Sequence, residues 1–432
     1  MMKKSIFGLL AAFVTVTALA QTAAHKEIDA NPLLSASNHV AYPYDESNLP
    51  QLTKAPDGYE PFYMAHYGRH GSRWLTGYRT YSRPVRMLER ADSAGQLTGL
   101  GKQVLSTLRL VRDRAYQRAG DLSDLGAEQH QAIARRMYRN FPEIFGGDAH
   151  IDARSTIVIR CILSMQNETS ALKALNPKLD IATDASLHDM HYMGWGYGED
   201  TLANSLRKSL DGLTDAYRNK YTHPERFIGS LIISQDWAKG NIDSNSLMND
   251  IFSVAGSLQN HHEFDGLYLL NLFTSEERYD LWKHNNIYWY THWANAPQNG
   301  NRMPYIEKAL LHNMIASADS VIACHGKGAS LRFGHETCLL PLACLLELDS
   351  VNDACDNLDS LDQRWVNYKF YPMGCNIQMV FYRNSGGDVL LKVLFNEHEA
   401  RLPFETKTFP YYKWNDIKRY YYEKSSKKIN WN

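Results

Sequence analysis

The sequence has little of several features that would place the protein in a large functional class. Neither charge is in excess, with 46 Lys and Arg against 47 Asp and Glu in 432 residues, which argues against a protein that coats nucleic acid or an anionic membrane. None of its 6 Cys residues forms a Cys-x-x-Cys pair, the common ligand spacing of a zinc site. After residue 20 no apolar run approaches the roughly 20 residues of a membrane span. What is present, 44% apolar residues with 26 Tyr and 9 Trp, indicates a folded chain with a large core.

The N-terminus has the three parts of a secretory signal peptide. Lys3 and Lys4 give it a positive start, residues 6–19 are apolar, and a small-x-small cleavage site precedes Gln21. The apolar run is shorter than a membrane span. We therefore expect residues 1–20 to be removed and the mature protein to be soluble and exported, either periplasmic or extracellular.

Export into an oxidising compartment would allow the cysteines to form disulfides. Six Cys residues admit 15 complete pairings, and the sequence does not choose among them. Buried free thiols are the alternative for a chain with this much core. Both remain open.

Short apolar runs alternate with helical periodicity at both ends of the chain. Strands are predicted at residues 61–66, 150–155 and 330–334, and a hairpin at residues 377–382 and 389–395. A helix is predicted to begin near Pro84, and Ser123 is predicted to cap another. This alternation favours an α/β domain with a central sheet flanked by helices.

The middle of the chain differs. Residues 186–305 are rich in His, Tyr and Trp and contain long helical stretches, such as residues 201–217. We therefore expect an inserted, mainly helical cap domain at residues 186–305, with the α/β domain built from residues 21–185 and 306–432. In open α/β sheets ligands bind at the carboxyl ends of the strands.

Two predicted strands end in residues that suit an anion. Arg69, His70 and Arg73 follow the strand at residues 61–66, and His335 and Glu336 follow the strand at residues 330–334. Arginine presents a planar fork that matches phosphate oxygens, and burying two arginines beside a histidine would be costly without an anion. With Arg160 as a third arginine, these residues are the parts of a phosphoryl-transfer site that needs no metal.

The combination resembles the histidine acid phosphatases, the branch of the histidine phosphatase superfamily that includes the phytases. The resemblance rests on four elements in order: Arg69-His70-Gly71-Ser72-Arg73, Leu122-Ser123-Asp124-Leu125-Gly126-Ala127-Glu128-Gln129, Arg160-x-x-x-Ser164, and His335-Glu336. Within this branch the chain looks most similar to the multiple inositol polyphosphate phosphatases. The supporting segments are Leu331-Arg332-Phe333-Gly334-His335, Leu339-Leu340-Pro341-Leu342, Asn376-Ile377-Gln378 and Phe395-Asn396-Glu397.

The chain departs from the family pattern at two places. Leu75 stands where family members usually have a proline two residues after the second arginine. The inositol polyphosphate phosphatases typically have His-Ala-Glu, whereas this chain has His335-Glu336-Thr337. With the downstream Leu-Leu-Pro-Leu in register, Glu336 occupies the position of the aspartate in the His-Asp phytases.

The resemblance implies a mechanism. His70 would be the nucleophile that accepts the phosphoryl group, and Glu336 would be the acid that protonates the leaving alkoxide. Phosphate oxygens would be held by Arg69, Arg73, Arg160 and His335. The resemblance implies no metal and no cofactor.

The expected activity is that of a secreted phosphomonoesterase whose substrates are inositol polyphosphates, phytate first. A further set of arginines at positions 79, 83, 86 and 90 would either line the mouth of the site for such a polyanion or form a solvated helix face. A broad acid or sugar phosphatase of the same family is the alternative among enzymes. A phosphate-binding protein without turnover is the alternative outside them. We expect a small polyanionic phosphate ester as the ligand, no nucleic acid and no membrane span, and the oligomeric state stays open.

Overall fold

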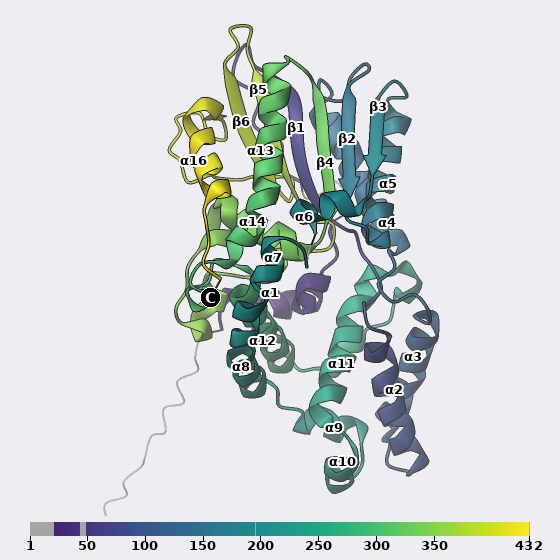
Figure 1. Cartoon of the computed structure of the whole chain (residues 1–432). Helices are drawn as coiled ribbons and strands as arrows, with labels where there is room; N and C mark the ends of the chain where they lie inside the picture. Colours follow the sequence, from purple (N-terminus) through teal and green to yellow (C-terminus); the bar gives the residue numbers. More distant parts are fainter. Residues whose placement is uncertain (1–20, 44–48, 195, 432) are drawn as a thin grey trace, which may run out of the picture.

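The computed structural model describes residues 21–43, 49–194 and 196–431, and the predicted signal peptide lies outside them. Its strands are β1 Glu60–Arg69, β2 His150–Ser155, β3 Asp180–Asp184, β4 Gly328–Gly334, β5 Asn376–Arg383, β6 Val389–Phe395, β7 His398–Glu399 and β8 Tyr412–Lys413. They form one sheet in the order β3-β2-β4-β1-β5-β6-β7, with β8 paired to β6 (Figure 1). Neighbouring strands from β3 to β1 are parallel, and β5 to β8 add an antiparallel half.

Helices surround this sheet and extend below it. Their bounds are α1 Ala23–Ala30, α2 Tyr78–Ser93, α3 Gly99–Arg114, α4 Asp124–Asn140, α5 Ile159–Leu175, α6 Met190–Met193, α7 Glu199–Leu202, α8 Asn204–Tyr221, α9 Glu225–Leu231, α10 Gln235–Asn241, α11 Ser244–Ser257, α12 Ser275–Trp293, α13 Lys308–Ala323, α14 Glu336–Leu346, α15 Asn367–Phe370 and α16 Trp414–Ser426. Short 3-10 helices join them, among them η1 Pro32–His39 and η3 Leu258–Asn260.

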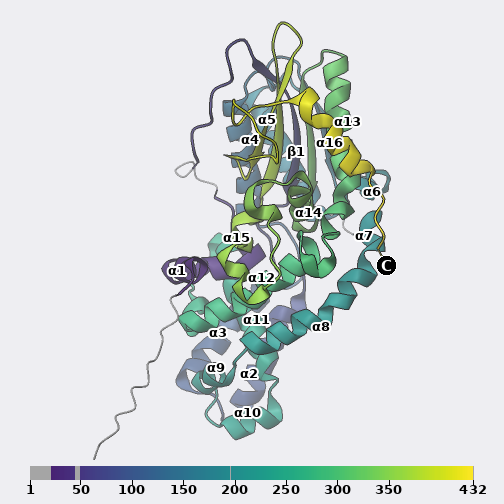
Figure 2. The ribbon, with the colours of Figure 1, turned by 90° about the vertical axis from the view of Figure 1, so that its left-hand side faces the viewer.

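The two faces of the sheet have separate cores. Successive side chains of a strand point to opposite faces, so Met64 of β1 packs with helices α4 and α5, and its neighbour Tyr63 packs with α13 and α16. Figure 2 shows α4 and α5 on one side of β1 and α13 and α16 on the other. Both faces of the sheet are therefore covered, which is typical of strands with near-continuous apolar runs.

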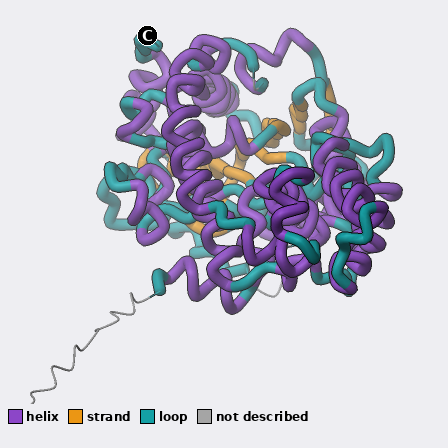
Figure 3. The backbone as a smooth tube through the Cα atoms, turned by 90° about the horizontal axis from the view of Figure 1, so that it is seen from below, coloured by secondary structure: helices purple, strands orange, loops and turns teal. Residues whose placement is uncertain are grey.

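Helices α2, α3 and α8 to α12 form a helical layer beyond the carboxyl ends of β1 and β4, below the sheet in Figure 1. Figure 3 views the molecule from this side, with the strands behind the helices. Helices α2 and α3 lie outside the predicted cap of residues 186–305, yet their Val85 and Leu108 share a core with Ile228 of α9 and Ile251 of α11. The helical layer thus draws on both parts of the chain, and the domain boundaries stay a prediction.

The structure confirms most of the predicted elements. Strands β1, β2, β4, β5 and β6 lie at the predicted places, and the side chain of Ser123 accepts a hydrogen bond from the Gly126 N–H at the start of α4. The predicted start of α2 near Pro84 was wrong: the helix begins at Tyr78 and holds Pro84 in its interior, so here the proline does not mark a first turn. Strand β3 was not predicted, because its mostly exposed residues lack an apolar run.

The cysteines are all free. Cys324 is exposed, and the other five are buried. Of the two alternatives that the sequence left open, the structure therefore has thiols without bridges. Among the described helices, none combines the length and the apolar character needed to cross a membrane.

Candidate active site

The site lies where β1 and β4 end side by side. These two strands are parallel and pair Arg69 with Gly334, so the residues after each strand leave the sheet at the same edge. The His70 N–H donates to the Gly334 carbonyl over 2.9 Å, which fixes the two chain segments to each other. The structure thus brings together the two groups of residues that the sequence placed at the ends of separate strands.

His70 has one ring nitrogen free. Its Nδ1 lies 2.9 Å from the Gly71 carbonyl oxygen, and because a carbonyl can only accept, Nδ1 carries the proton. Its Nε2 is buried and has no hydrogen-bond partner among the described residues. Burial, reinforced by the charges of Arg160, Arg69 and Arg73, holds the pKa of His70 well below its usual range. The imidazole is therefore neutral, with a lone pair on Nε2.

Three guanidinium groups surround this lone pair. Arg69 Nη2 donates to Glu336 Oε1 over 2.8 Å, and its Nη1 donates to the carbonyls of Asn38 and Tyr371. Arg73 donates to the Trp74 carbonyl, and burial lowers its pKa to about 10. The Nε atoms of Arg73 and Arg160 are buried without a partner in the described part of the chain. Buried cations with unused donors suit an anionic ligand.

His335 and Glu336 stand at the N-terminus of α14. Burial and the charge of Arg160 lower the pKa of His335 to about 3, and Arg160 Nη2 lies 3.4 Å from its Nδ1. Because a guanidinium only donates, Nδ1 is the acceptor and Nε2 is left with the proton to donate elsewhere. Burial alone would raise the pKa of Glu336, but the charges of Arg69 and Arg73 outweigh it and lower that pKa to about 2. Its Oε2 lies 3.8 Å from His70 Nε2.

A cation is the other ligand that these groups could hold. Ligand atoms of His70, His335 and Glu336 all lie within 4.8 Å of one another. However, the guanidiniums of Arg69, Arg73 and Arg160 act on the same pocket, and their positive charges repel a metal ion. The charge balance of the donor set fits a phosphate better than a metal.

The remaining family elements hold the loop that carries His70. The Gly71 N–H donates to Ser164 Oγ over 3.1 Å, and the Ser72 N–H donates to Gln129 Oε1 over 2.8 Å. The Ser123 N–H donates to the Ser72 carbonyl. These contacts explain why the Leu122 to Gln129 element and Ser164 accompany the first signature: they fix its backbone rather than contact a ligand.

We expect Gly126→Ala to lower the melting temperature and the activity together. A Cβ atom on Gly126 would lie 2.2 Å from the Ser72 carbonyl oxygen, so the loop that carries His70 would have to move. Overpacking of this kind costs about 1–3 kcal/mol. The matched control is Gly212→Ala on α8, where a Cβ meets nothing within 4 Å and a small gain in stability is expected. Equal melting temperatures for the two variants would contradict this.

Stability is expected to fall as the pH drops below about 6.5. Burial lowers the pKa of His335 and His261 to about 3 and that of His66 to about 4. Between these values and about 6.5 the unfolded chain binds protons that the folded chain does not, so the free energy of unfolding falls by up to about 1.4 kcal/mol per pH unit for each histidine. Glu336, with its pKa lowered to about 2, acts in the same direction below about pH 4.5.

This pH dependence is measured as the melting temperature from about pH 7 to about pH 4, with and without inorganic phosphate. Phosphate is expected to raise the melting temperature, because an anion gives the unused donors of Arg73 and Arg160 a partner. A melting temperature that does not change over this range would show that the buried histidines take up protons in the folded protein.

Several residues at the site were not predicted from the sequence. Asn38 and His39 of η1 reach the site from the N-terminal end of the described chain. The Asn38 side chain contacts Glu336. Burial of His39, together with the charges of Arg73 and Arg69, lowers its pKa to about 3. Asn260 of η3 accepts from Ser72 Oγ and donates to the His39 carbonyl. No local pattern marks these residues, because they become important only through contacts with distant segments.

Three of the four arginines at positions 79 to 90 form hydrogen bonds or ion pairs with residues outside the site. Arg83 forms a bidentate ion pair with Asp250 of α11, and Arg90 donates to Asn241 of α10. Arg86 donates to Ser82 on its own helix. These contacts lie within the helical layer and favour a structural or solvated role for the three.

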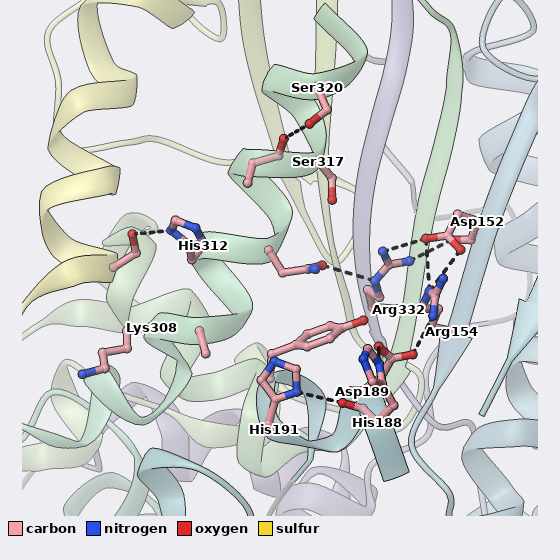
Figure 4. Close-up of a pocket in the computed structure, with 15 residues that line it drawn as sticks. Asp152, Arg154, His188, Asp189, His191, Lys308, His312, Ser317, Ser320 and Arg332 are labelled. Atoms are coloured by element: carbon pink, nitrogen blue, oxygen red, sulfur yellow. Dashed lines mark hydrogen bonds and ion pairs between the residues drawn. The ribbon is translucent and has the colours of Figure 1, made fainter. Parts of the chain in front are cut away.

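A cavity of about 740 Å³ lies away from this site, between α13 and strands β2 and β4. Figure 4 shows the carboxylate of Asp152 between the guanidiniums of Arg332 and Arg154, and Asp189 on Arg154. Arg332 Nη2 lies 2.8 Å from Asp152, and Arg154 Nη1 lies 2.7 Å from Asp189. The two guanidiniums in this cavity thus have carboxylate partners, whereas the Nε atoms of Arg73 and Arg160 have no partner among the described residues.

No protein-family model matches the chain, and no curated protein matches it. Its structure, however, is similar to several solved structures. The multiple inositol polyphosphate phosphatase of Bifidobacterium longum, in complex with inositol hexasulfate, has a TM-score of 0.72 at 16% identity, over 89% of this chain and 96% of the other. The phytase of D. castellii has a TM-score of 0.65 at 15% identity, over 97% and 91%.

The phytase of Hafnia alvei is a third similar structure, with a TM-score of 0.52 at 12% identity, over 86% of this chain and 98% of the other. All three matches extend over most of the chain and include the sheet and the helical layer. The chain therefore has the mixed α/β fold of the histidine acid phosphatases and phytases, as the resemblance in its sequence predicted.

Proposed function

We propose that the protein is an exported phosphomonoesterase that hydrolyses inositol polyphosphates, phytate first, through a phosphohistidine on His70. One observation carries the proposal: the lone pair of His70 Nε2 is unpartnered, and its histidine is kept neutral by burial and by three guanidiniums. A neutral imidazole is the nucleophilic form. The cations beside it are the groups that neutralise charge on a phosphoryl group during transfer.

The reaction has two balanced steps. His70 Nε2 forms a bond to phosphorus while the bond from phosphorus to the ester oxygen breaks, and Glu336 gives its proton to the departing alkoxide. Water then attacks the phosphohistidine, the N–P bond breaks, and Glu336 takes the proton of that water. The products are an alcohol and inorganic phosphate.

Glu336 must be protonated for the first step, although Arg69 and Arg73 lower its pKa to about 2. A bound phosphate neutralises the guanidiniums that cause this shift, and its negative charge favours the protonated carboxyl. Substrate binding therefore raises the pKa of Glu336. The Glu336 carboxyl therefore carries a proton only when an anionic substrate is bound, so it donates a proton only in the enzyme–substrate complex.

The substrate class is supported by the proteins of similar structure. The Bifidobacterium longum phosphatase has been solved with inositol hexasulfate and with phosphate, and the Hafnia alvei phytase with myo-inositol hexakis sulphate. Inositol polyphosphates carry the same arrangement of anionic ester groups. The predicted signal peptide supports export.

A broad acid or sugar phosphatase remains the second candidate, and a specific observation favours it. Ile157, Ile159 and Leu163 are exposed on the segment that carries Arg160, and Arg83 and Arg90 are bound to other residues. With these arginines bound to other residues, fewer cations are free to bind additional phosphate groups, which favours a substrate that carries fewer phosphates than phytate.

The test incubates the pure protein with phytate and a chelator and follows phosphate release and the inositol phosphate products, with glucose 1-phosphate as the comparison. A denaturing quench during turnover is expected to trap phosphohistidine at His70. Faster turnover of glucose 1-phosphate would favour the sugar phosphatase. If the protein binds phosphate but neither releases phosphate from an ester nor forms a phosphohistidine, it is a phosphate-binding protein without turnover.

A further inference from the structure

The N-terminal segment around η1 is built into the active site. The Asn260 side chain donates to the His39 carbonyl over 2.9 Å, and the Met373 N–H donates to the Val40 carbonyl over 2.8 Å. The Asn38 carbonyl accepts from Arg69 Nη1 over 2.8 Å. The segment is thus fixed both to the helical layer and to the loops at the ends of the strands.

The side chain of Asn38 acts on one oxygen of Glu336. Asn38 Nδ2 donates to Oε1 over 3.0 Å, and Arg69 Nη2 donates to the same Oε1 over 2.8 Å. The other oxygen, Oε2, is the one that lies 3.8 Å from His70 Nε2. Two donors on Oε1 therefore turn the carboxyl so that Oε2 faces the place where phosphorus would be attacked.

The backbone before Asn38 is strained. Ser37 has a φ of 58° and a ψ of −122°, a conformation that a residue with a side chain rarely adopts and that persists only where its surroundings impose it. Ser37 Oγ donates to Asn285 and accepts from Asn367 Nδ2. The partners of Ser37 hold its backbone in this strained conformation. The conformation sets the direction of the chain at the next residue, so that the Asn38 side chain points toward Glu336.

We propose that Asn38 is a positioning residue for the acid, which holds Glu336 Oε1 so that the proton is carried on Oε2 toward the leaving group. This inference rests on the proposed function, because it assumes that Glu336 is the acid. The expected donors to the phosphate belong to the arginines and His335, and the contact between Arg69 and Asn38 uses the Asn38 backbone carbonyl rather than its side chain.

The test replaces Asn38 with alanine and compares an alkyl ester, phytate, with an activated aryl ester, p-nitrophenyl phosphate. An alkoxide leaving group needs the proton and a nitrophenolate does not. A misdirected catalytic group costs up to about 100-fold, so kcat/KM on phytate is expected to fall about 10- to 100-fold and kcat/KM on the aryl ester, which reports only the transfer to His70, to stay within about 2-fold. Inhibition by inorganic phosphate is expected to be unchanged.

Asn38→Asp keeps the shape of the side chain but replaces the donor with a second carboxylate. It is expected to show the same preference for the aryl ester, with a loss on phytate at least as large. The matched control is Asn31→Ala in the same segment, where the side chain accepts from the Leu33 N–H and has no contact with Glu336. This variant is expected to keep the wild-type ratio of the two activities, and melting temperatures establish that each variant is folded.

Equal losses of kcat/KM on both esters, or no loss, in folded Asn38 variants would overturn the positioning role. A wild-type protein that hydrolyses neither ester and forms no phosphohistidine would instead overturn the proposed function. The two failures are thus distinguished by the wild type alone.

Discussion

Replacing His70 with alanine is expected to lower phytate turnover by more than about 10⁴-fold and to abolish the trapped phosphohistidine. The variant removes the imidazole whose buried Nε2 has no hydrogen-bond partner among the described residues and on which the charges of three guanidiniums act. Binding of phosphate is expected to survive, because Arg73 and Arg160 remain. The measurements are phosphate release from phytate, incorporation of phosphate into the quenched protein, and the dissociation constant for inorganic phosphate.

The matched control for this variant is His188→Ala. His188 is a surface histidine whose side chain is 85% exposed and contacts Asp189 in the separate cavity of Figure 4, so the activity of the variant is expected to equal that of the wild type. A His70→Ala protein that still forms a covalent phosphoenzyme would show that another residue is the nucleophile. Full activity without a covalent intermediate would indicate direct attack by water.

Glu336→Gln is expected to slow the hydrolysis of alkyl phosphates by about 10²- to 10⁴-fold, the usual contribution of a general acid. Activated aryl phosphates need no proton on the leaving group, so their transfer to His70 is expected to slow far less. Glutamine keeps the shape of the side chain and can still accept from Asn38 and Arg69. The measurement is the ratio of kcat/KM on phytate to kcat/KM on p-nitrophenyl phosphate, because kcat/KM reports the transfer to His70 and not the later hydrolysis of the phosphohistidine.

The second step gives this prediction a further readout. Without a base to activate water, the phosphohistidine is expected to break down more slowly, so more of it is trapped during turnover of the aryl ester. An equal loss on both esters, with no accumulation of phosphohistidine, would refute the assignment of Glu336 as acid and base. Glu263→Gln, at a glutamate in the helical layer, is the control and is expected to leave the ratio unchanged.

The residues of the site could be predicted from the sequence because they lie in short local signatures. Arg69, His70 and Arg73 follow one buried strand, and His335 and Glu336 follow another, so the position of each group depended only on where its strand ends. That the two groups meet depends on the pairing of β1 with β4, which brings together residues more than 250 positions apart. The resemblance to a family, rather than the periodicity of the chain, implied that the two groups act in one site, and neither predicted the pairing of the strands.

The rest could not be predicted, for physical reasons. Asn38 and Asn260 are ordinary polar residues in irregular segments, and their roles come from partners that are far away in the sequence. Strand β3 is a short edge strand with mostly exposed residues, so burial leaves no pattern in it. The sequence left Arg83 either at the mouth of the site or on a solvated helix face, because an isolated sequence cannot show that Asp250 pairs with it.

The contact between Asn38 and Glu336 also constrains how the protein can fold. These residues are 298 positions apart, and contacts of such separation form late, because a long loop must close first. Asn38 is synthesised long before Glu336, so the pocket cannot be completed until at least the first 336 of the 432 residues have been made. Catalytic activity therefore requires a contact that forms late in folding. On refolding, the activity on alkyl phosphates is expected to recover more slowly than the secondary structure.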